Sequence, residues 1–462
     1  MPGYTAFQWL EIAQHELLLF AGIFFLIGSL DELVIDFAWL WLRLTGRATA
    51  DRFNGDAAEP LAGRTAVLIP AWREADVVGA MIAHCLEAWR QDEVRLYAGC
   101  YRNDPETLAA LVGGAGGDPR VRIVVHDADG PTTKADCLNR LYAALVDDER
   151  RQGLRARSVL LHDAEDLVHP AELTLIDRAL DQADFVQLPV MPVPQRHSRF
   201  VAGHYGDEFA EAHGKALVVR DRLGAGLPAA GVGCGFARDA LERIATVRGQ
   251  GGDPFAAECL TEDYELGLLI GESGGRSRFL RIRDASGELV ATREFFPAKL
   301  DYAVRQKTRW MHGIAFQGWD RLGWNARPVE LWMRLRDRRG PLTALVLAAA
   351  YALVVMWGLL LLAEALGWHH ARPFGRAIRT ILWINFAAVL WRGAFRFAFT
   401  TRAYGPVEGM LALLRIPVAN VIAIIAGRRA TVAYLRTLAG GQPTWEKTIH
   451  HHHPATLRAA EA

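Results

Sequence analysis

The hydrophobic pattern divides the chain into apolar ends and a mixed middle. The clearest apolar segment, 341–363, has no charged residue in 23 positions, and a helix needs about 20 apolar residues to cross a bilayer. We therefore predict a transmembrane helix over 341–363. Four arginines come just before it, and the positive-inside rule places that end, and the residues before it, in the cytoplasm.

The first apolar segment is interrupted by acids. Fourteen uncharged residues, Leu17–Leu30, are followed by Asp31, Glu32 and Asp36 and then by FAWLWL. No Lys or Arg precedes the run and no A-x-A site follows it, so we predict a signal anchor over 16–42 after an N-terminal segment, 1–15, rather than a signal peptide. Because acids facing lipid are costly, either they pair with Arg392 or Arg396 or the span ends at Leu30.

Two further segments are apolar but carry arginines. We predict a third transmembrane helix over 377–400, and the segment 406–430 is either an interfacial or re-entrant helix or a fourth span. A spanning fourth helix would place the arginines after it outside, which the charge rule disfavours. We therefore favour three spans, an interfacial or re-entrant helix and a cytoplasmic tail, 431–462.

The middle of the chain alternates short β-branched runs with helical patterns. Strands are predicted at 65–70, 94–100, 121–126 and 158–163, and helices at 74–90, 105–112 and 134–146. Such alternation predicts an α/β domain with a parallel sheet buried on both faces. Ligands of open sheets of this kind bind beyond the carboxyl ends of the strands.

An acidic group, DAED, follows the last of these strands. Acids after a strand are often only helix N-caps. However, Asp163, Glu165 and Asp166 fall within four positions and repel one another, and hard oxygen ligands suit Mg²⁺ or Mn²⁺, which in turn hold a diphosphate. We therefore predict a divalent cation site here.

Charge and cysteine content exclude other classes. The 52 basic residues balance 52 acidic ones, which argues against a protein that binds nucleic acid through a broad basic face. All five cysteines lie between Cys85 and Cys259 without C-x-x-C spacing, so we predict neither disulfides nor a zinc site. For the histidine run 450–453 we do not expect metal binding.

Six short motifs follow one another along the chain: IPAWRE, ND, TKADCLN, DAED, TED and QKTRW. In this order they resemble the membrane-embedded family 2 glycosyltransferases, the class of cellulose and hyaluronan synthases. The DAED form, the N-terminal span and the C-terminal WEKTIH are most similar to bacterial inner-membrane transferases of the bacteriophage-adsorption type. The resemblance implies a GT-A glycosyltransferase domain with a Rossmann-like mixed sheet over 43–300, and amphipathic interface helices over 301–340.

The resemblance also implies a donor site. Asp163 matches the first metal ligand of the family, and the second is Asp166, slightly favoured, or Glu165. Where the family has two acids this chain has Asn103 and Asp104, which makes base selectivity less certain. An ordinary solvated helix start is the alternative for the TKADCLN segment. The residues implied in nucleotide binding are Pro70, Ala71, Glu74, Asn103, Asp104, Lys134 and Asn139.

The remaining motifs concern catalysis and the acceptor. Asp263, beside Glu262 in TED, matches the base that deprotonates the acceptor hydroxyl, although the segment would also cap a helix. In QKTRW the resemblance implies that the Arg donates two hydrogen bonds to a diphosphate and that the Trp stacks on a sugar ring. The alternative is an amphipathic helix at the membrane interface. The residues implied in diphosphate or acceptor binding are Gln306, Arg309, Trp310, Gly233, Cys234 and Gly235.

The function implied is inverting transfer from a UDP-sugar, with Mg²⁺ or Mn²⁺, that extends a polysaccharide at the cytoplasmic face of the bacterial inner membrane and exports it. The expected partners are the nucleotide sugar, a glycan acceptor, membrane lipid and a periplasmic or outer-membrane export protein. Two alternatives remain: transfer of a single sugar to a lipid phosphate, and a structural role in an envelope or phage-adsorption complex.

Overall fold

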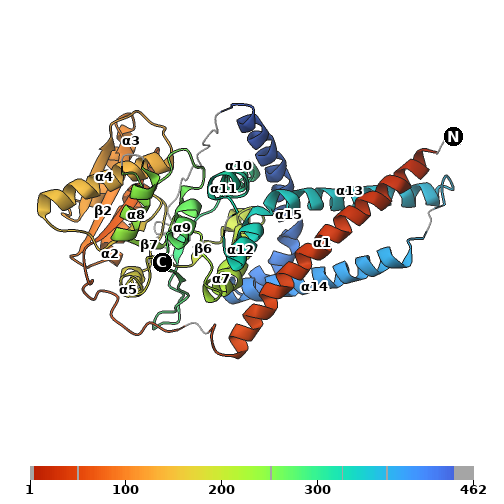
Figure 1. Cartoon of the computed structure of the whole chain (residues 1–462), viewed down its shortest axis with the longest axis horizontal. Helices are drawn as coiled ribbons and strands as arrows, with labels where there is room; N and C mark the ends of the chain where they lie inside the picture. Colours follow the sequence, from red (N-terminus) through yellow and green to blue (C-terminus); the bar gives the residue numbers. More distant parts are fainter. Residues whose placement is uncertain (1–4, 49–50, 250–251, 325, 371–372, 442–462) are drawn as a thin grey trace.

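A computed structural model describes residues 5–48, 51–249, 252–324, 326–370 and 373–441. It has an α/β domain, which the sequence predicts to be catalytic and which is called the catalytic domain from here on, on one side and a group of long helices on the other (Figure 1). The WEKTIH segment, the histidine run 450–453 and most of the predicted tail lie outside the described residues.

The catalytic domain is built on a seven-stranded mixed sheet in the order β3-β2-β1-β4-β7-β5-β8. The pairs β1–β2, β2–β3 and β1–β4 are parallel, whereas β7 runs antiparallel to both β4 and β5. The four predicted strands are confirmed, with the last shortened. The strands are β1 (Thr65–Pro70), β2 (Val94–Tyr101), β3 (Val121–His126), β4 (Ser158–Leu161), β5 (Phe185–Gln187), β7 (Cys234–Ala237) and β8 (Ser277–Phe279).

Helices cover both faces of this sheet. In β1, Val67 and Ile69 face one core, while Ala66 and Leu68 face the other, as the alternation of side chains in a strand requires. Burial on both faces explains why the strand reads as an unbroken apolar run. One face is covered by α2 (Val78–Ala88), α3 (Pro105–Ala115) and α5 (Glu172–Ala179), the other by α4 (Lys134–Gln152), α8 (Arg238–Arg248) and α9 (Glu262–Glu272).

A second layer joins the sheet to the long helices. The short strands β6 (Val190–Pro192) and β9 (Thr292–Glu294) pair in parallel as a separate ribbon. The helix α6 (Gly203–Glu211) continues through a π-helical turn, Ala212–Ala216, into α7 (Leu217–Arg222). The predicted interface segment, 301–340, forms α10 (Leu300–Met311), a π-helical turn (His312–Gln317), α11 (Gly318–Leu322) and α12 (Pro328–Arg338).

Within the described residues, four helices are long and apolar enough to cross a membrane: α1 (Ala6–Leu44), α13 (Gly340–Ala365), α14 (Arg376–Tyr404) and α15 (Pro406–Leu438). The first three extend away from the catalytic domain, with the chain start and the α13–α14 connection at the far end (Figure 1). In the same view α15 runs steeply across them, between the bundle and α10.

The helix α15 is anchored to the catalytic domain along its length. Its Ile422 packs in one core with Tyr205 of α6 and Val304 of α10. Arg415, in the middle of α15, is buried and lies 2.6 Å from Asp207 of α6. A helix held in this way differs from the other three, which touch the catalytic domain mainly near one end.

The acids of α1 decide between the two interpretations of the first span. The helix does not end at Leu30 but continues to Leu44. The predicted pairing is confirmed for Glu32, whose carboxylate lies 2.9 Å from Arg392 of α14. Of the two arginines named as alternatives, Arg392 is the one that pairs with this acid, while Arg396 lies 3.8 Å from Glu211 of α6.

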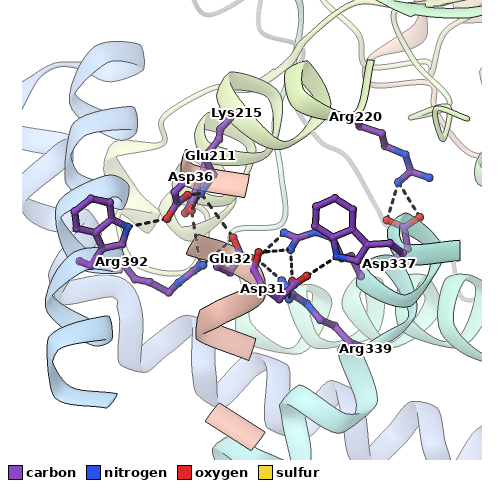
Figure 2. Close-up of polar contacts among 12 residues, drawn as sticks. Asp31, Glu32, Asp36, Glu211, Lys215, Arg220, Asp337, Arg339 and Arg392 are labelled. Atoms are coloured by element: carbon purple, nitrogen blue, oxygen red, sulfur yellow. Dashed lines mark hydrogen bonds and ion pairs between the residues drawn. The ribbon is translucent and has the colours of Figure 1, made fainter. Parts of the chain in front are cut away.

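These contacts belong to a junction network that joins α1, α6, α12 and α14 (Figure 2). Asp31 and Glu32 bind Arg336 of α12 and Arg339, the residue that follows this helix. Buried acids are tolerated when each has a cationic partner, and here two indole N–H groups contribute as well. The members are Asp31, Glu32, Asp36, Glu211, Lys215, Trp332, Arg336, Arg339, Trp391 and Arg392.

Candidate active site

A cavity of about 150 Å³ lies at the carboxyl end of the sheet. Its lining includes at least one residue from each of five of the six segments that the sequence singled out. The lining residues that the sequence predicted are Pro70, Ala71, Glu74, Lys134, Asp163, Glu165, Glu262, Asp263, Gln306, Arg309 and Trp310.

Sheet topology explains why these distant segments meet. β1 and β4 are adjacent and parallel, so the residues after Pro70 and after Leu161 lie at the same edge. Because β7 is antiparallel to β4, the residues that precede β7, rather than those that follow it, reach this edge. Ala230 and Val232 accordingly line the cavity.

The acids of DAED take different directions. Asp163 and Glu165 line the cavity. Asp166 is fully buried below it, where its carboxylate lies 2.7 Å from His162 Nδ1 and accepts a hydrogen bond from the Asp163 N–H. The other ring nitrogen of His162 lies 2.8 Å from Glu172. The structure thus assigns Asp166 to a buried carboxylate–imidazole group and leaves Asp163 and Glu165 at the cavity.

Burial and charge act in opposite directions on His162. Burial alone would lower its pKa, but the charge of Glu172 and the hydrogen bonds that the ring donates to Asp166 and Glu172 outweigh this effect and raise the pKa to about 10. The imidazolium is therefore the stable form at neutral pH. Its single positive charge is shared between Asp166 and Glu172, the two acids beneath the DAED turn.

Lys134 is the basic residue closest to the acids. It is the first residue of α4, after Thr133, whose side chain accepts a hydrogen bond from Asp136 N–H. Its ammonium lies 2.5 Å from Asp163. Burial would lower the pKa of Lys134, but the charges of Asp163, Glu262 and Asp263 raise it above the usual value, so the cation is retained.

The TED motif begins α9 and presents two carboxyl groups. Asp263 Oδ1 accepts a hydrogen bond from the Tyr264 N–H at 2.7 Å. Burial raises the pKa of Asp263, and the charge of Lys134 opposes this rise. Burial and the neighbouring Asp263 raise the pKa of Glu262 to about 7. Thr261 precedes α9 without a capping hydrogen bond from its side chain, so the capping alternative lacks that contact.

A glycine leaves room for Asp263. Gly231 has a φ of +79°, and a Cβ built at this position would collide with the Asp263 carboxylate. Gly231 begins the glycine-rich segment GVGCGFAR, residues 231–238. It is not one of the three residues predicted there, which are Gly233, Cys234 and Gly235.

The QKTRW residues share one face of α10. Gln306, Arg309 and Trp310 are spaced as i, i+3 and i+4, positions that neighbour one another on a helix, and all three line the cavity. The Trp310 ring lies edge-on to Phe296, 6.3 Å between centroids. Trp310 is thus packed into the wall of the cavity.

Other predicted residues are structural in this arrangement. Asn139 is buried and clamps Phe255 with two backbone hydrogen bonds of 2.8 and 3.0 Å. Asp104 caps α3 and accepts a hydrogen bond from the Arg73 N–H. Asn103 exchanges hydrogen bonds with the backbone of Gly130. These residues shape the loops around the cavity, but its lining does not include them.

The predicted acceptor residues of the glycine-rich segment are also displaced from the cavity. Cys234 and Gly235 lie in β7, in the middle of the sheet, where Cys234 is fully buried. A Cβ at Gly233 would collide with Thr292, and one at Gly235 with Ile176. The antiparallel direction of β7 brings the residues before the strand, Ala230 and Val232, to the cavity, and Cys234 and Gly235 lie within the strand itself.

Sequence reasoning missed part of the lining. Glu294, at the end of β9, faces the cavity, and burial together with the charges of Asp166, Glu165 and Asp163 raises its pKa well above the usual value. Glu294 follows a three-residue strand without a recognisable motif, so its approach to DAED depends on the ribbon alone. The other missed residues include Trp72, Tyr101, Thr132, Thr133 and Phe296.

Comparison with known proteins decides the family. The family model described as "Glycosyltransferase like family 2" matches residues 62–313, more than half of the chain. The chain belongs to this family. The predicted class, an α/β GT-A domain with a mixed sheet and an α-helical membrane region, is thereby confirmed.

The relatives of this family 2 glycosyltransferase include proteins named for phage adsorption. Bacteriophage adsorption protein B of Escherichia coli strain K12 is 32% identical over 456 residues, which cover 93% of this chain and 61% of that protein. Bacteriophage N4 adsorption protein B of Escherichia coli O157:H7 matches to the same extent. The chain spans about three fifths of the length of these relatives. Among solved structures, mannosyltransferase PcManGT from Pyrobaculum calidifontis, in complex with GDP-Man and Mn2+, is 17% identical, with a TM-score of 0.49 over 88% of this chain and 99% of that one.

Proposed function

We propose that the chain transfers a sugar, with inversion, from a UDP-sugar to a glycan acceptor, using Asp263 as the base. The observation that carries this proposal is the convergence of Asp263, Lys134 and Arg309 on one cavity beside the DAED acids. A buried carboxyl group with a raised pKa is suited to accept a proton near neutral pH.

The acids of the cavity fit a divalent cation. Asp163, Glu165 and Glu294 offer hard oxygen donors. The pKa of Glu294 is raised by burial and by the charges of the neighbouring acids, and a cation would relieve this repulsion. We propose Asp163 and Glu165 as the ligands that hold Mg²⁺ or Mn²⁺, because Asp166 is turned toward His162. When bound, such a cation offsets charge on a leaving diphosphate.

The basic groups are placed to bind the diphosphate. Lys134 stands at the N-terminus of α4, where backbone N–H groups and the helix dipole favour anions. Arg309 approaches the same cavity from α10, and its guanidinium can donate two parallel hydrogen bonds. Pro70, Ala71 and Glu74 remain for the nucleoside, at the end of β1.

Asp263 then has one defined task. It accepts the proton of the acceptor hydroxyl as that oxygen attacks the sugar carbon from the side opposite the leaving UDP, which inverts the configuration. The hydrogen bond from the Tyr264 N–H orients one carboxylate oxygen and leaves Oδ2 on the side of Gly231.

We further propose that the catalytic domain lies in the cytoplasm, beside the bacterial inner membrane. Arginines gather where the bundle meets this domain, at the ends of α1, α12 and α14, as the positive-inside rule requires of a cytoplasmic side. The steep crossing of α15 and its buried Arg415–Asp207 ion pair support an interfacial fourth helix. With three spans, product would leave along the bundle toward an export partner.

Purified full-length chain, incubated with individual UDP-sugars and Mn²⁺, tests the reaction directly. We expect UDP release with at least one donor and a loss of about a thousand-fold in Asp263→Asn. The matched control is Asp239→Asn, which alters a surface aspartate paired with Arg155 and should retain full activity. Full release by Asp263→Asn would refute the assigned base.

Product size separates processive extension from single transfer. A ladder of polymers indicates extension, whereas one lipid-linked sugar indicates transfer to a lipid phosphate. The names of the relatives favour a second role in phage adsorption. A strain that carries Asp263→Asn and still adsorbs phage would show that this role does not need transfer.

A further inference from the structure

A second cavity, of about 330 Å³, lies between the catalytic domain and the end of α14. It is formed by the β6–β9 ribbon, the segment 281–289 and residues 402–404. It does not open on the candidate active site. Instead the two cavities lie on opposite faces of β9, because Glu294 lines the first and the adjacent Arg293 lines the second.

The charge of this second cavity is strongly unbalanced. Four arginines line it, Arg281, Arg283, Arg293 and Arg402, against a single acid, Glu288. That acid is already engaged, since its carboxylate lies 2.8 Å from Arg293. The excess positive charge therefore belongs to the other three arginines.

Two of these arginines have no partner among the residues that the structure describes. Arg283 donates a hydrogen bond to the Gly287 carbonyl at 2.5 Å. Across the described parts of the chain, neither the Arg281 nor the Arg402 guanidinium makes a hydrogen bond or ion pair. Burial, and then the charges of Arg402, Arg283 and Arg43, lower the pKa of Arg281 to about 10, which shows that like charges face one another here.

The position of the cavity indicates what neutralises this charge. Arg402 lies in the last turn of α14 and Arg43 in the last turn of α1, where both helices reach the catalytic domain (Figure 1). Basic pockets beside the ends of membrane helices bind anionic head groups. Arg281 and Arg402 also border a small adjoining slot lined by Phe209 and Phe399, which suits the apolar part of a lipid.

The geometry points to a phosphate-binding site in this cavity, in which Arg281 and Arg402 hold the phosphate of an anionic membrane lipid. A guanidinium matches the oxygens of a phosphate with paired hydrogen bonds. The ligand would fix the end of α14 to the β6–β9 ribbon, on the face opposite the catalytic cavity. The site is independent of the sugar that the enzyme transfers.

Binding to full-length protein in a non-ionic detergent tests the site. The probes are short-chain phosphatidylglycerol, short-chain phosphatidylcholine and inorganic phosphate. We expect wild type to prefer phosphatidylglycerol over phosphatidylcholine, and the double variant Arg281→Gln/Arg402→Gln to bind phosphatidylglycerol about 30-fold more weakly, at roughly five-fold for each charge.

The matched control removes two charges from the other end of the same helix. Arg376 and Arg379 are exposed residues in the first turn of α14, and Arg376→Gln/Arg379→Gln should bind phosphatidylglycerol as wild type does. UDP release by the variants checks that they are folded. If the double variant fails to fold, Arg402→Gln alone, at an exposed position, should still lose about five-fold.

Each outcome is decisive. Equal binding of phosphatidylglycerol by wild type and the folded variant would overturn the site, as would wild type that binds neither phosphatidylglycerol nor inorganic phosphate. If wild type binds inorganic phosphate as tightly as phosphatidylglycerol, and the folded variant loses this binding, the site is retained and its ligand is a soluble phosphate.

Discussion

Two clusters of acids in this molecule are built in opposite ways. In the junction network, the acids of α1 and α6 each lie beside an Arg or Lys. In the catalytic cavity, six acids face two basic residues, Lys134 and Arg309. The first cluster is neutralised within the protein, whereas the second has an excess of negative charge.

This difference separates structural from functional acids. A neutralised buried cluster holds helices in register. In the cavity, burial first and then repulsion from neighbouring acids raise the pKa values of Glu262 and Glu294. Such repulsion is tolerated where a ligand supplies the missing positive charge. Removing a charged side chain from the junction should therefore lower the free energy of unfolding, whereas removing an acid from the cavity without metal should raise it.

The largest effect is expected at the junction. Lys215 is almost completely buried, 2.5 Å from Asp36 and 2.7 Å from Glu211. Lys215→Met leaves these carboxylates short of one cation and should lower the free energy of unfolding by about 3–5 kcal/mol, measured by thermal unfolding in detergent. The control, Arg155→Met, removes a surface arginine that also binds two acids and should cost less than about 1 kcal/mol. Equal losses of stability in Lys215→Met and Arg155→Met would contradict a special role for the buried network.

In the cavity, a substitution that changes only the shape of the site, and no charge, should reduce catalysis. Gly231→Ala pushes the Asp263 carboxylate aside, and a displacement of about 1 Å can reduce kcat about a hundred-fold. The control is Gly274→Ala, whose φ of +81° is similar but whose Cβ would meet no atom within 4 Å. Both variants should lose roughly 1–2 kcal/mol of stability from the left-handed backbone, and only Gly231→Ala should lose turnover. A wild-type kcat in Gly231→Ala would contradict the placement of the base.

The pH profile tests the electrostatics of that base. Asp263 must be deprotonated to act, so kcat/KM falls as the pH drops through its pKa, and burial moves this limb above that of an ordinary aspartate. Lys134 lowers the same pKa. Lys134→Gln should therefore move the limb upward by about one pH unit, while Lys134→Arg, which keeps the charge, should leave it nearly unchanged. A downward shift in Lys134→Gln would be inconsistent with this account.

The smallest effect concerns Glu294. Its pKa is raised in the folded protein. Without metal, the wild type therefore loses stability as the pH rises above the usual glutamate pKa, because Glu294 then ionises in the unfolded chain but stays protonated in the folded protein. Glu294→Gln removes this loss and should be more stable by roughly 1 kcal/mol or less at neutral pH, with the difference vanishing at low pH. Thermal unfolding in EDTA measures it, and added Mn²⁺ should favour the wild type. A variant less stable than wild type at neutral pH would argue against repulsion.

The sequence predicted about half of the catalytic lining, because these residues follow strands or lie in short motifs. Residues after β1 and β4 reach one edge in any parallel sheet, so Pro70 and Asp163 could be placed from local pattern alone. The choice between Glu165 and Asp166 could not be made in this way. It depends on His162 and Glu172, which draw Asp166 beneath the turn.

The sequence by itself determined the β/α alternation, the apolar helices and the motif residues, because strand and helix periodicity and chemical type are local properties. Only the tertiary structure decided the direction of β7, the approach of Glu294, the partners of the α1 acids and the arginine-lined cavity beside α14. Each of these depends on pairing between segments far apart in the chain, where packing and charge neutralisation select one arrangement among many that the local pattern permits.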